Sequence, residues 1–370
     1  MILQDIELKN FRLHLDTNLH FSDKKNFIMG GNGQGKTTIL EAIYYLCTSK
    51  NFSLYDLETL NFENSFFQIG GIFKSVTENK VKVVFSREEG RKSYFVNNKQ
   101  VNRTSEIIGK FPIVILTPSD HNITQGTPGD RRKFFDSVIS QASQTYLQTL
   151  LDYNKTARQR SSLLNQIKDT GNRGLLGQLD AWTEKLVITG TEIIKSRIKF
   201  LSEFQEYLNQ SYSDIMKEYE EPSVEYEYLG KKNETDDIEG SFRQIINISV
   251  DDEIRRGTNL FGPHRDEYKF RLNNIDLKKY GSQGQHKTFQ VMLRFAEYFY
   301  LKEKLGNDPV FLMDDVFGEL DAYRAGKISE HLENLGQTFI TITDFTNLSY
   351  LKKSESDITI KINKGVASYA

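Results

Sequence analysis

Alternating apolar and polar positions predict strands over most of the first 110 residues. Ile6 and Leu8 alternate with charged residues, and positions 81–85 repeat the period of two. Asn97-Asn98 follows a further apolar run and is typical of a tight hairpin turn. The unbroken apolar run 111–116 then predicts a strand buried on both faces. This part of the chain is therefore predicted to be mainly β.

After Gly129 the pattern changes to a helical period. Apolar residues recur three and four positions apart over 134–157 and again over 175–215. The turn at 170–174 separates the two runs, and Glu220-Glu221-Pro222 ends the second. Heptads do not continue for long, so we predict a compact antiparallel helical domain and not an extended coiled-coil arm.

In the last third of the chain, strand and helix patterns alternate. Alternating apolar residues predict a strand at 268–272, and apolar runs predict strands at 310–313 and 338–342. Helical periods over 288–305 and 322–332 lie between them. Such alternation is typical of an α/β layer with parallel strands.

The simplest architecture is one head formed by both ends of the chain, with the helical domain inserted between them. We expect residues 1–125 to form the N-terminal part of the head and residues 251–370 its C-terminal part. Residues 126–250 would be the helical insertion. The fold class is therefore α/β.

Composition and charge narrow the class of protein. Of 370 residues, 38% are hydrophobic and 26% are charged, as in folded globular proteins. The formal net charge of −2 excludes an overall basic nucleic-acid binder, so DNA contacts would need local basic patches. The single cysteine, Cys47, excludes an internal disulfide and fits a reducing compartment. Without a signal-peptide core or a run of ~18 apolar residues, we expect a soluble, cytoplasmic protein with no membrane partner.

A glycine-rich stretch, GGNGQGKTT, matches the phosphate-loop pattern G-x-x-x-x-G-K-[ST]. It lies between an apolar strand pattern, 26–29, and a helical pattern, 39–47, so phosphates would meet a helix N-terminus. Lys36 can reach the β- and γ-phosphates of a nucleotide, and the Thr37 hydroxyl can bind Mg²⁺. The residues expected to bind ATP here are Gly30, Gly31, Asn32, Gly33, Gln34, Gly35, Lys36, Thr37 and Thr38.

A second motif is the apolar run PVFLM at 309–313, which ends in two acids. This is the Walker B arrangement, in which the first acid, Asp314, holds the Mg²⁺ shell. Asp315 is placed to act as a general base on the attacking water. On the pattern alone, two solvated loop acids are an equally good interpretation, and the phosphate loop favours the functional one.

A third motif, SQGQ at 282–285, opens the predicted helix before the Walker B strand. It resembles the signature motif of ABC-type ATPases, where the signature of one subunit completes the nucleotide site of the other. We therefore expect Ser282, Gly284 and Gln285 to contact the nucleotide of a second copy. The alternative is an N-capped helix without that role. Residues 318–321 follow as the D-loop does in such enzymes.

Six short motifs, spread over both head segments and the helical block, point to one family. They are LKNFR (8–12), GGNGQGKTT (30–38), PGDRRKFFD (128–136), FGPHRD (261–266), GSQGQ (281–285) and LMDDVFGELD (312–321). Together they resemble the RecF family of bacterial recombination mediators, which is related to SMC and ABC-type DNA-repair ATPases. The short helical block separates the chain from SMC proteins with long arms.

The resemblance implies an ABC/SMC-like P-loop ATPase head of mixed β-sheets and helices, with an inserted antiparallel helical domain. It implies a protein that binds ATP and Mg²⁺, forms a homodimer on ATP, and binds DNA at single-strand gaps or double-strand/single-strand junctions. There it would act with RecO and RecR to help load the recombinase and support the SOS response. The residues with catalytic roles in this scheme are Lys36, Ser282, Asp314 and Asp315.

Two departures from the ABC pattern predict slow turnover. Asp315 stands where ABC proteins have a longer glutamate, and a shorter acid reaches less well toward water. After the last buried strand, 341–344 reads TITD, without the switch histidine. The position expected for the glutamine loop carries TPSD at 117–120, with Gln125 close by. We therefore predict a slow DNA-dependent ATPase.

Clustered basic residues are the candidates for DNA phosphate contacts. The pairs Arg158 with Arg160 and His264 with Arg265 are candidates of the same kind, and each cluster alone is more often a solvated face or a helix-capping cluster than a DNA contact. The clusters with the strongest claim are Arg131, Arg132 and Lys133, and Arg255 with Arg256.

Two other classes of function stay open on the sequence. One is a nucleotide-binding subunit of an ABC-type transporter docked on a membrane partner. The other is a nucleotide-gated scaffold in which partner binding matters and hydrolysis is incidental. The missing switch histidine and the SQGQ form of the signature disfavour the transporter.

Overall fold

The computed structural model describes residues 1–52, 55–61, 63–215, 220–232, 237–319, 321–343, 351 and 353–370. These residues form two compact units, each assembled from segments far apart in the sequence. Unit 1 contains Met1–Asp120 and Val291–Ala370, with a short segment that begins at Ser213. Unit 2 contains His121–Tyr212 and Glu220–Gln290, so residues 251–290 pack with the helical block.

Unit 1 contains an antiparallel sheet with the strand order β2-β1-β4-β5-β6-β7. The period-two pattern explains its two faces, because Val81, Val83 and Phe85 of β5 are buried while Lys80 and Lys82 are exposed. The strands predicted for this region are therefore confirmed. Their bounds are β1 Ile2–Phe11, β2 His14–His20, β4 Phe66–Lys74, β5 Glu78–Ser86, β6 Arg91–Val96 and β7 Lys99–Val101.

The second sheet of unit 1 has the order β16-β15-β3-β14-β13-β8 and is parallel except for the β15–β16 pair. Every residue of β13 and β14 is buried, which explains why both strands are apolar runs. The strands expected at 310–313 and 338–342 are confirmed. The bounds are β3 Lys25–Met29, β8 Ile113–Leu116, β13 Val310–Met313, β14 Thr338–Ile342, β15 Ile358–Asn363 and β16 Val366–Tyr369.

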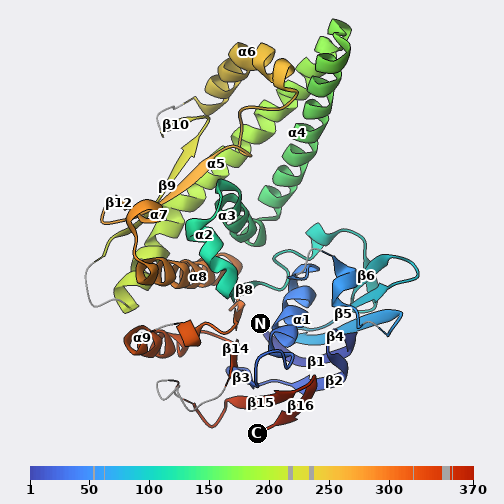
Figure 1. Cartoon of the computed structure of the whole chain (residues 1–370), viewed down its shortest axis with the longest axis vertical. Helices are drawn as coiled ribbons and strands as arrows, with labels where there is room; N and C mark the ends of the chain where they lie inside the picture. The colour runs from blue at the N-terminus through green and yellow to red at the C-terminus, as the bar shows by residue number, and fades with distance from the viewer. Residues whose placement is uncertain are drawn as a thin grey trace. The chain divides into compact units, whose positions relative to one another are not determined.

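Helix α1, Lys36–Thr48, fills the core between the two sheets of unit 1 (Figure 1). Ile39 and Leu46 of α1 belong to the same buried cluster as Phe67 of the antiparallel sheet and Leu312 of the parallel sheet. Cys47 is buried in this cluster, as expected, and burial raises the pKa of its thiol. The strand–loop–helix arrangement predicted around residues 30–35 is confirmed.

Helices α8, Gln283–Leu305, and α9, Ala322–Leu332, confirm the two helices predicted late in the chain. In unit 1, Phe295 of α8 stacks on Phe311 of β13, with ring centroids 5.5 Å apart. His331 of α9 meets Phe295 edge-on at 4.8 Å. The aromatic contacts fix both helices on the strand that carries the paired acids. Short 3₁₀ helices are η1 Asp56–Thr59, η2 Thr104–Glu106, η3 Pro118–Asp120, η4 Arg173–Leu175 and η5 Phe317–Glu319.

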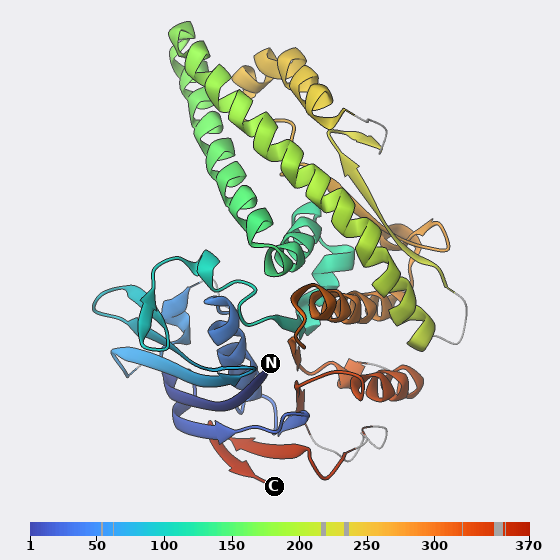
Figure 2. The ribbon, with the colours of Figure 1, turned by 180° about the vertical axis from the view of Figure 1, so that it is seen from behind.

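Unit 2 is built on two long helices that run side by side in opposite directions (Figure 2). Leu164 and Ile167 of α4 share a buried cluster with Leu179 of α5, near the turn that joins them. The antiparallel helices expected from the period are therefore confirmed. The helices of this unit are α2 His121–Gln125, α3 Pro128–Ala142, α4 Gln144–Thr170, α5 Leu176–Ile215, α6 Ile238–Arg256 and α7 Leu277–Tyr280.

A small antiparallel sheet of order β10-β9-β11-β12 completes unit 2. The alternation of Tyr268, Phe270 and Leu272 predicted β11, whereas helix α6 was missed. Phe242 and Ile246 are among only a few buried residues on this mostly polar helix, so its period is weak. The bounds are β9 Pro222–Tyr228, β10 Lys231–Lys232, β11 Glu267–Leu272 and β12 Ile275–Asp276.

A buried arginine links three helices of unit 2. The Arg160 guanidinium, fully buried, donates to Glu253 Oε2 and to Asn259 Oδ1, each at 2.7 Å, and to Thr183 Oγ1 at 2.8 Å. Glu253 is also fully buried. A buried charge of this kind is stable only while its partner is present. Arg160 is therefore a structural residue of this unit.

We predict that Arg160→Met lowers the free energy of unfolding by about 3–5 kcal/mol, because it leaves the Glu253 carboxylate buried without its cation. The matched control is Arg255→Met, which breaks an exposed pair with Asp252 and should cost less than about 1 kcal/mol. Urea unfolding followed by circular dichroism measures both. Equal losses for the two variants would contradict the structural role of Arg160.

Candidate nucleotide site

The phosphate loop connects β3 to α1 at the carboxyl edge of the parallel sheet of unit 1. Gly33 and Gly35 have φ values of 73° and 104°, which favour glycine because a Cβ would be strained there. The backbone N–H of Gly30 donates to the carbonyl of Ile342, at the end of the neighbouring strand β14, at 3.2 Å. The loop therefore delivers backbone N–H groups and the start of α1 to one edge of the sheet, which suits a phosphate.

Lys36 is the first residue of α1 and is buried. Its Nζ donates to the carbonyl oxygens of Gly30 and Gly31 at 2.7 and 3.0 Å. The ammonium group is thus folded back over the loop. A phosphate arriving in the loop would compete with these two carbonyls for the same cation.

Thr37 and Asp314 are in direct contact, although 277 positions separate them. The Thr37 hydroxyl donates to Asp314 Oδ1 at 2.9 Å, and Thr341 Oγ1 donates to the same oxygen at 2.8 Å. Burial raises the pKa of Asp314, and the charge of Asp315 raises it further, while the two threonine hydroxyls and Lys36 oppose the shift. The hydroxyl and the carboxylate predicted to share one metal ion are therefore neighbours.

Asp315 lines a cavity next to the phosphate loop. It is exposed, and its backbone is left-handed, with a φ of 50°. Its N–H donates to Thr341 Oγ1 at 2.8 Å. Thr341 therefore holds both acids in place, one through a side chain and one through the backbone. No sequence motif marks Thr341 for this role. Asp344 lies outside the described residues.

A cavity of about 470 Å³ opens between the phosphate loop and the paired acids. Its lining includes Asn32, Gly33, Gly35, Lys36, Thr37 and Thr38 of the predicted set. Gln34 is not part of that lining, and its side-chain oxygen accepts from the Lys364 N–H at 2.7 Å. Leu13, Glu58, Leu60 and Asn61 line the opposite side and were missed, because no short motif marks them. Arg12 joins them, with its guanidinium on the Glu41 carboxylate.

The signature residues lie in unit 2, at the start of α8. Ser282 Oγ accepts from the Gln285 N–H at 3.2 Å, and Gln285 Oε1 accepts from the Ser282 N–H at 2.9 Å. This reciprocal pair is a capping box, so the N-cap interpretation holds as local structure. Ser282 is exposed and Gly284 half-buried. Because this cap is exposed, it does not conflict with the expected contact between Ser282 and the nucleotide of a second copy.

Two neighbouring motifs are described in part. Asp321 caps helix α9 by accepting from the Arg324 N–H at 2.9 Å. Leu320, in the middle of the expected D-loop, lies outside the described residues. At the position expected for a glutamine loop, the Asp120 carboxylate accepts two bonds from Arg294, at 2.8 and 2.9 Å. An ion pair therefore stands at the place where a glutamine was expected.

The basic residues expected to bind DNA divide into buried and exposed ones. Arg131 is buried, and its guanidinium donates to the Glu267 carboxylate at 2.8 and 3.0 Å and to the carbonyl of Gly126. A DNA phosphate cannot reach a guanidinium occupied in this way, so the expectation for Arg131 does not fit its position. Lys133, like Arg255 and Arg256 at the end of α6, is exposed.

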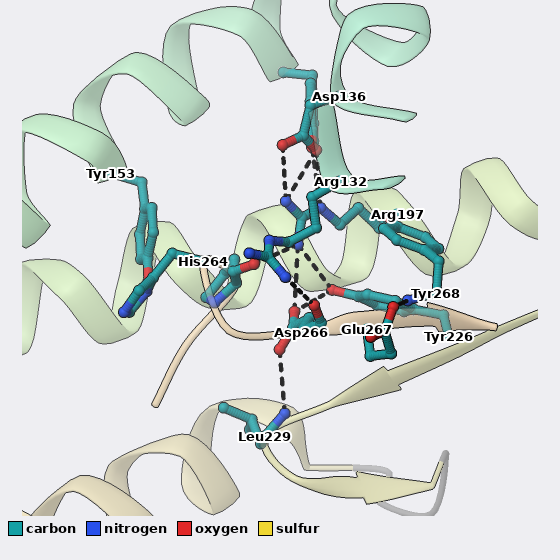
Figure 3. A network of polar contacts seen from close by, with 12 residues as sticks. Arg132, Asp136, Tyr153, Arg197, Tyr226, Leu229, His264, Asp266, Glu267 and Tyr268 are labelled. Carbon is teal, nitrogen blue, oxygen red and sulfur yellow. Dashed lines mark hydrogen bonds and ion pairs between the residues drawn. The ribbon is translucent and has the colours of Figure 1, made fainter. Parts of the chain in front are cut away.

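Arg132 sits at the edge of a buried network that centres on Arg197 (Figure 3). Arg197, from α5, is bound by both oxygens of Asp136, at 3.1 and 3.0 Å, and by Asp266 at 3.3 Å. Arg132 donates to the backbone carbonyl of Asp266 and not to its carboxylate. Burial lowers the pKa of Arg132, and the positive charge of Arg197 lowers it further. The carboxylates of Asp266, Glu267 and Asp136 oppose this shift, so the network holds charges of both signs.

Comparison with known proteins adds independent evidence. The model of the RecF/RecN/SMC N terminal domain matches residues 2–367. The DNA replication and repair protein RecF of Chloroherpeton thalassium is 40% identical over 362 residues, which are 95% of this chain and 98% of that protein. The protein of the same name from Salinibacter ruber is 37% identical over 93% of this chain and 85% of its own length.

Solved structures extend the likeness to the fold. The recombination mediator protein RecF of the RecFOR pathway, in its ATP form, has a TM-score of 0.90 at 32% identity, over all of this chain and 97% of that one. The Smc head domain of Pyrococcus furiosus has a TM-score of 0.56 at 13% identity and shares the fold. The fold class predicted from the sequence is therefore confirmed.

The resemblance predicted from six short motifs is confirmed over nearly the whole chain. The cavity lined by residues of the phosphate loop and the paired acids thus lies in a fold shared with the RecF structures. In sequence and in fold, the chain belongs to the RecF family of DNA replication and repair proteins.

Proposed function

We propose that this chain is an ATP-dependent DNA-binding protein of recombinational repair and replication. It dimerises on ATP at single-strand gaps or double-strand/single-strand junctions, and with RecO and RecR it helps to load the recombinase and supports the SOS response. The observation that carries the proposal is the contact between Thr37 and Asp314 beside the phosphate-loop cavity. The related structure of RecF with ATP supports ATP as the nucleotide.

ATP and Mg²⁺ fit the residues around this cavity. Thr37 Oγ1 and the Asp314 carboxylate are the hard oxygen donors that Mg²⁺ prefers, and bound Mg²⁺ would neutralise charge on the phosphates. The described residues include no cluster of three or more His, Cys, Asp or Glu side chains. A magnesium site of this type needs none, because phosphate and water oxygens complete the shell. Lys36 would exchange the carbonyls of Gly30 and Gly31 for phosphate oxygens.

Hydrolysis is proposed to be slow, and to serve release from DNA. Asp315 faces the cavity and would hold the attacking water, while Thr341 restrains its backbone. Its side chain is one methylene shorter than glutamate. Because Asp315 reaches less far toward water, we expect it to be a weak general base. Slow hydrolysis would then keep ATP bound for longer.

Dimerisation is proposed to close the site. Ser282 is exposed at the start of α8, where its capping box fixes the turn. A hydroxyl and free N–H groups at a helix N-terminus suit the γ-phosphate of a partner's ATP. The cavity lining described above comes entirely from unit 1, so the signature would be supplied by the second copy.

DNA contacts are proposed for Arg132, Lys133 and Arg265. Lys133 and Arg265 are exposed, and Arg132 is half-buried at the edge of the network around Arg197. Arg255 and Arg256 form a second candidate patch at the end of α6. Phosphate contacts of this kind give affinity without sequence preference.

The transporter interpretation loses support. The relatives are named as DNA replication and repair proteins. No helix of the described residues is long and apolar enough to cross a bilayer, a finding that does not bear on a subunit docked on a membrane partner. We propose a cytoplasmic protein, because bacterial DNA and the partners RecO and RecR are there.

Two variants separate ATP binding from dimerisation. Lys36→Ala should weaken ATP binding by about 10- to 100-fold, because a charged contact to phosphate is lost. Ser282→Ala should bind ATP as a monomer within about twofold of the wild type, yet lose ATP-induced dimerisation. Analytical ultracentrifugation with and without ATP, on gapped DNA, measures this. A Ser282→Ala protein that still dimerises on ATP would remove that serine from the site.

Asp315→Asn tests the proposed base. We expect ATP turnover to fall by about 10²- to 10⁴-fold with ATP-dependent DNA binding retained. Wild-type turnover near the roughly 10 s⁻¹ typical of enzymes would contradict slow hydrolysis. If DNA repair in cells survives the loss of turnover, the nucleotide-gated scaffold gains support over the release role.

The DNA patch is tested by the salt dependence of binding. Replacing Arg132 and Lys133 by glutamine should weaken binding to every sequence and lower the slope of log K against log salt by about 2, one for each cation. Arg131→Gln is the matched control, because its guanidinium is buried on Glu267. It should lower thermal stability and leave the slope unchanged. If the slope changed for Arg131→Gln alone, Arg131 would be the DNA contact in place of Arg132 and Lys133.

A further inference from the structure

The turn of the β15–β16 hairpin touches the phosphate loop directly. Lys364 and Gly365 form a two-residue turn between paired residues Asn363 and Val366. Both have left-handed backbones, with φ values of 48° and 78°, as a tight hairpin turn requires. From this turn, the Gly365 N–H donates to the carbonyl of Gln34 at 3.0 Å, and the Lys364 N–H donates to Gln34 Oε1 at 2.7 Å.

The fit between the hairpin and its neighbours excludes side chains at two glycines. A Cβ at Gly30 would lie 2.4 Å from the carbonyl oxygen of Ile362 in β15. A Cβ at Gly365 would lie 2.1 Å from the carbonyl oxygen of Leu13. Each distance is far below a van der Waals contact. Gly30 is therefore required by the hairpin as well as by phosphate chemistry.

His14 holds the loop from the neighbouring strand β2. The ring is fully buried, with Nε2 3.1 Å from the carbonyl of Gly35 and Nδ1 3.1 Å from Thr17 Oγ1. Burial lowers the pKa of His14, so the neutral ring is favoured. A carbonyl only accepts, so Nε2–H donates to Gly35 and Nδ1 accepts from the Thr17 hydroxyl. That hydroxyl also lies 3.4 Å from the carbonyl of Gly365.

We propose that the β15–β16 turn and His14 are positioning elements of the phosphate loop, and that they set its affinity for ATP. The inference rests on the proposed binding of ATP at this loop. Glycine at four of the six positions 30–35 gives the loop many alternative backbone conformations. The hairpin and His14 fix residues 34 and 35 before a ligand arrives, so ATP binding does not bear the full entropy of ordering the loop.

The side chain of Gln34 has a defined part in this arrangement. Because it accepts from Lys364 and is not in the cavity lining, its role is to attach the loop to the hairpin and not to contact the nucleotide. Its backbone N–H is still available to a phosphate. The interaction between the hairpin and the loop is therefore separable by substitution from the residues that touch ATP.

The test compares variants that break these bonds with variants that keep them. Gln34→Met removes the acceptor for Lys364, and His14→Leu removes the donor to Gly35. Lys364→Asn is the control for the turn, because asparagine tolerates a left-handed backbone and keeps the N–H. His14→Gln is the conservative rescue, because its amide can donate to the same carbonyl.

Affinity is measured with the fluorescent analogue N-methylanthraniloyl-ATP, and thermal unfolding without nucleotide reports the fold. We expect Gln34→Met and His14→Leu to weaken binding about 5- to 20-fold, with turnover at saturating ATP within about twofold of the wild type. Lys364→Asn and His14→Gln should bind within about twofold of the wild type. This split between affinity and saturated turnover is the signature of a positioning role.

Two results would count against different claims. If the wild type binds the analogue and both Gln34→Met and His14→Leu bind equally well, the positioning role is wrong. If the wild type itself fails to bind, the proposed ATP function is wrong. His14 is buried, so His14→Leu is paired with Gln34→Met, which changes a half-buried residue and separates loss of affinity from loss of folding. If Gln34→Met and His14→Leu melt at the wild-type temperature and bind the analogue with unchanged affinity, the inference is wrong.

Discussion

The parallel pairing of β3, β14 and β13 is the constraint on which the rest of the site depends. Met29 pairs with Ile342 and Met313 with Ile340, so the carboxyl ends of three strands meet at one edge of the sheet. Residues almost 300 positions apart in the chain become neighbours there. The Thr37–Asp314 contact is a direct result. Burial of β13 and β14 on both faces makes this register costly to change.

Much of the site was predictable because it is carried by short motifs. A glycine-rich loop between a strand and a helix, and an apolar strand that ends in acids, can each be recognised from a few neighbouring residues. Helix α1 and the strands at 310–313 and 338–342 follow from the same patterns. The patterns do not show which residues of distant segments contact one another. Thr341, which binds both acids, is one unremarkable threonine in a buried strand.

The residues that the sequence did not reveal depend on contacts between distant segments, whereas helix α6 has a weak period. His14 is one of two histidines in a polar strand, and only the fold places it against Gly35. Arg131 is the opposite case. It belongs to a basic cluster in the sequence, but the sequence does not show that its guanidinium is paired with Glu267. Helix α6 was missed because it buries few residues.

The central claim is that ATP is held in a site shared by two copies, and mixing two inactive variants tests it most directly. Lys36→Ala lacks the phosphate-loop half of the site and Ser282→Ala lacks the signature half. In a symmetric dimer their heterodimer contains one complete site. Because neither variant is expected to dimerise on ATP by itself, the dimers in an equal mixture should be heterodimers, with up to about half of the wild-type number of complete sites and a matching share of the ATP turnover. A mixture that stays as inactive as either variant, at every ratio, would contradict the shared site.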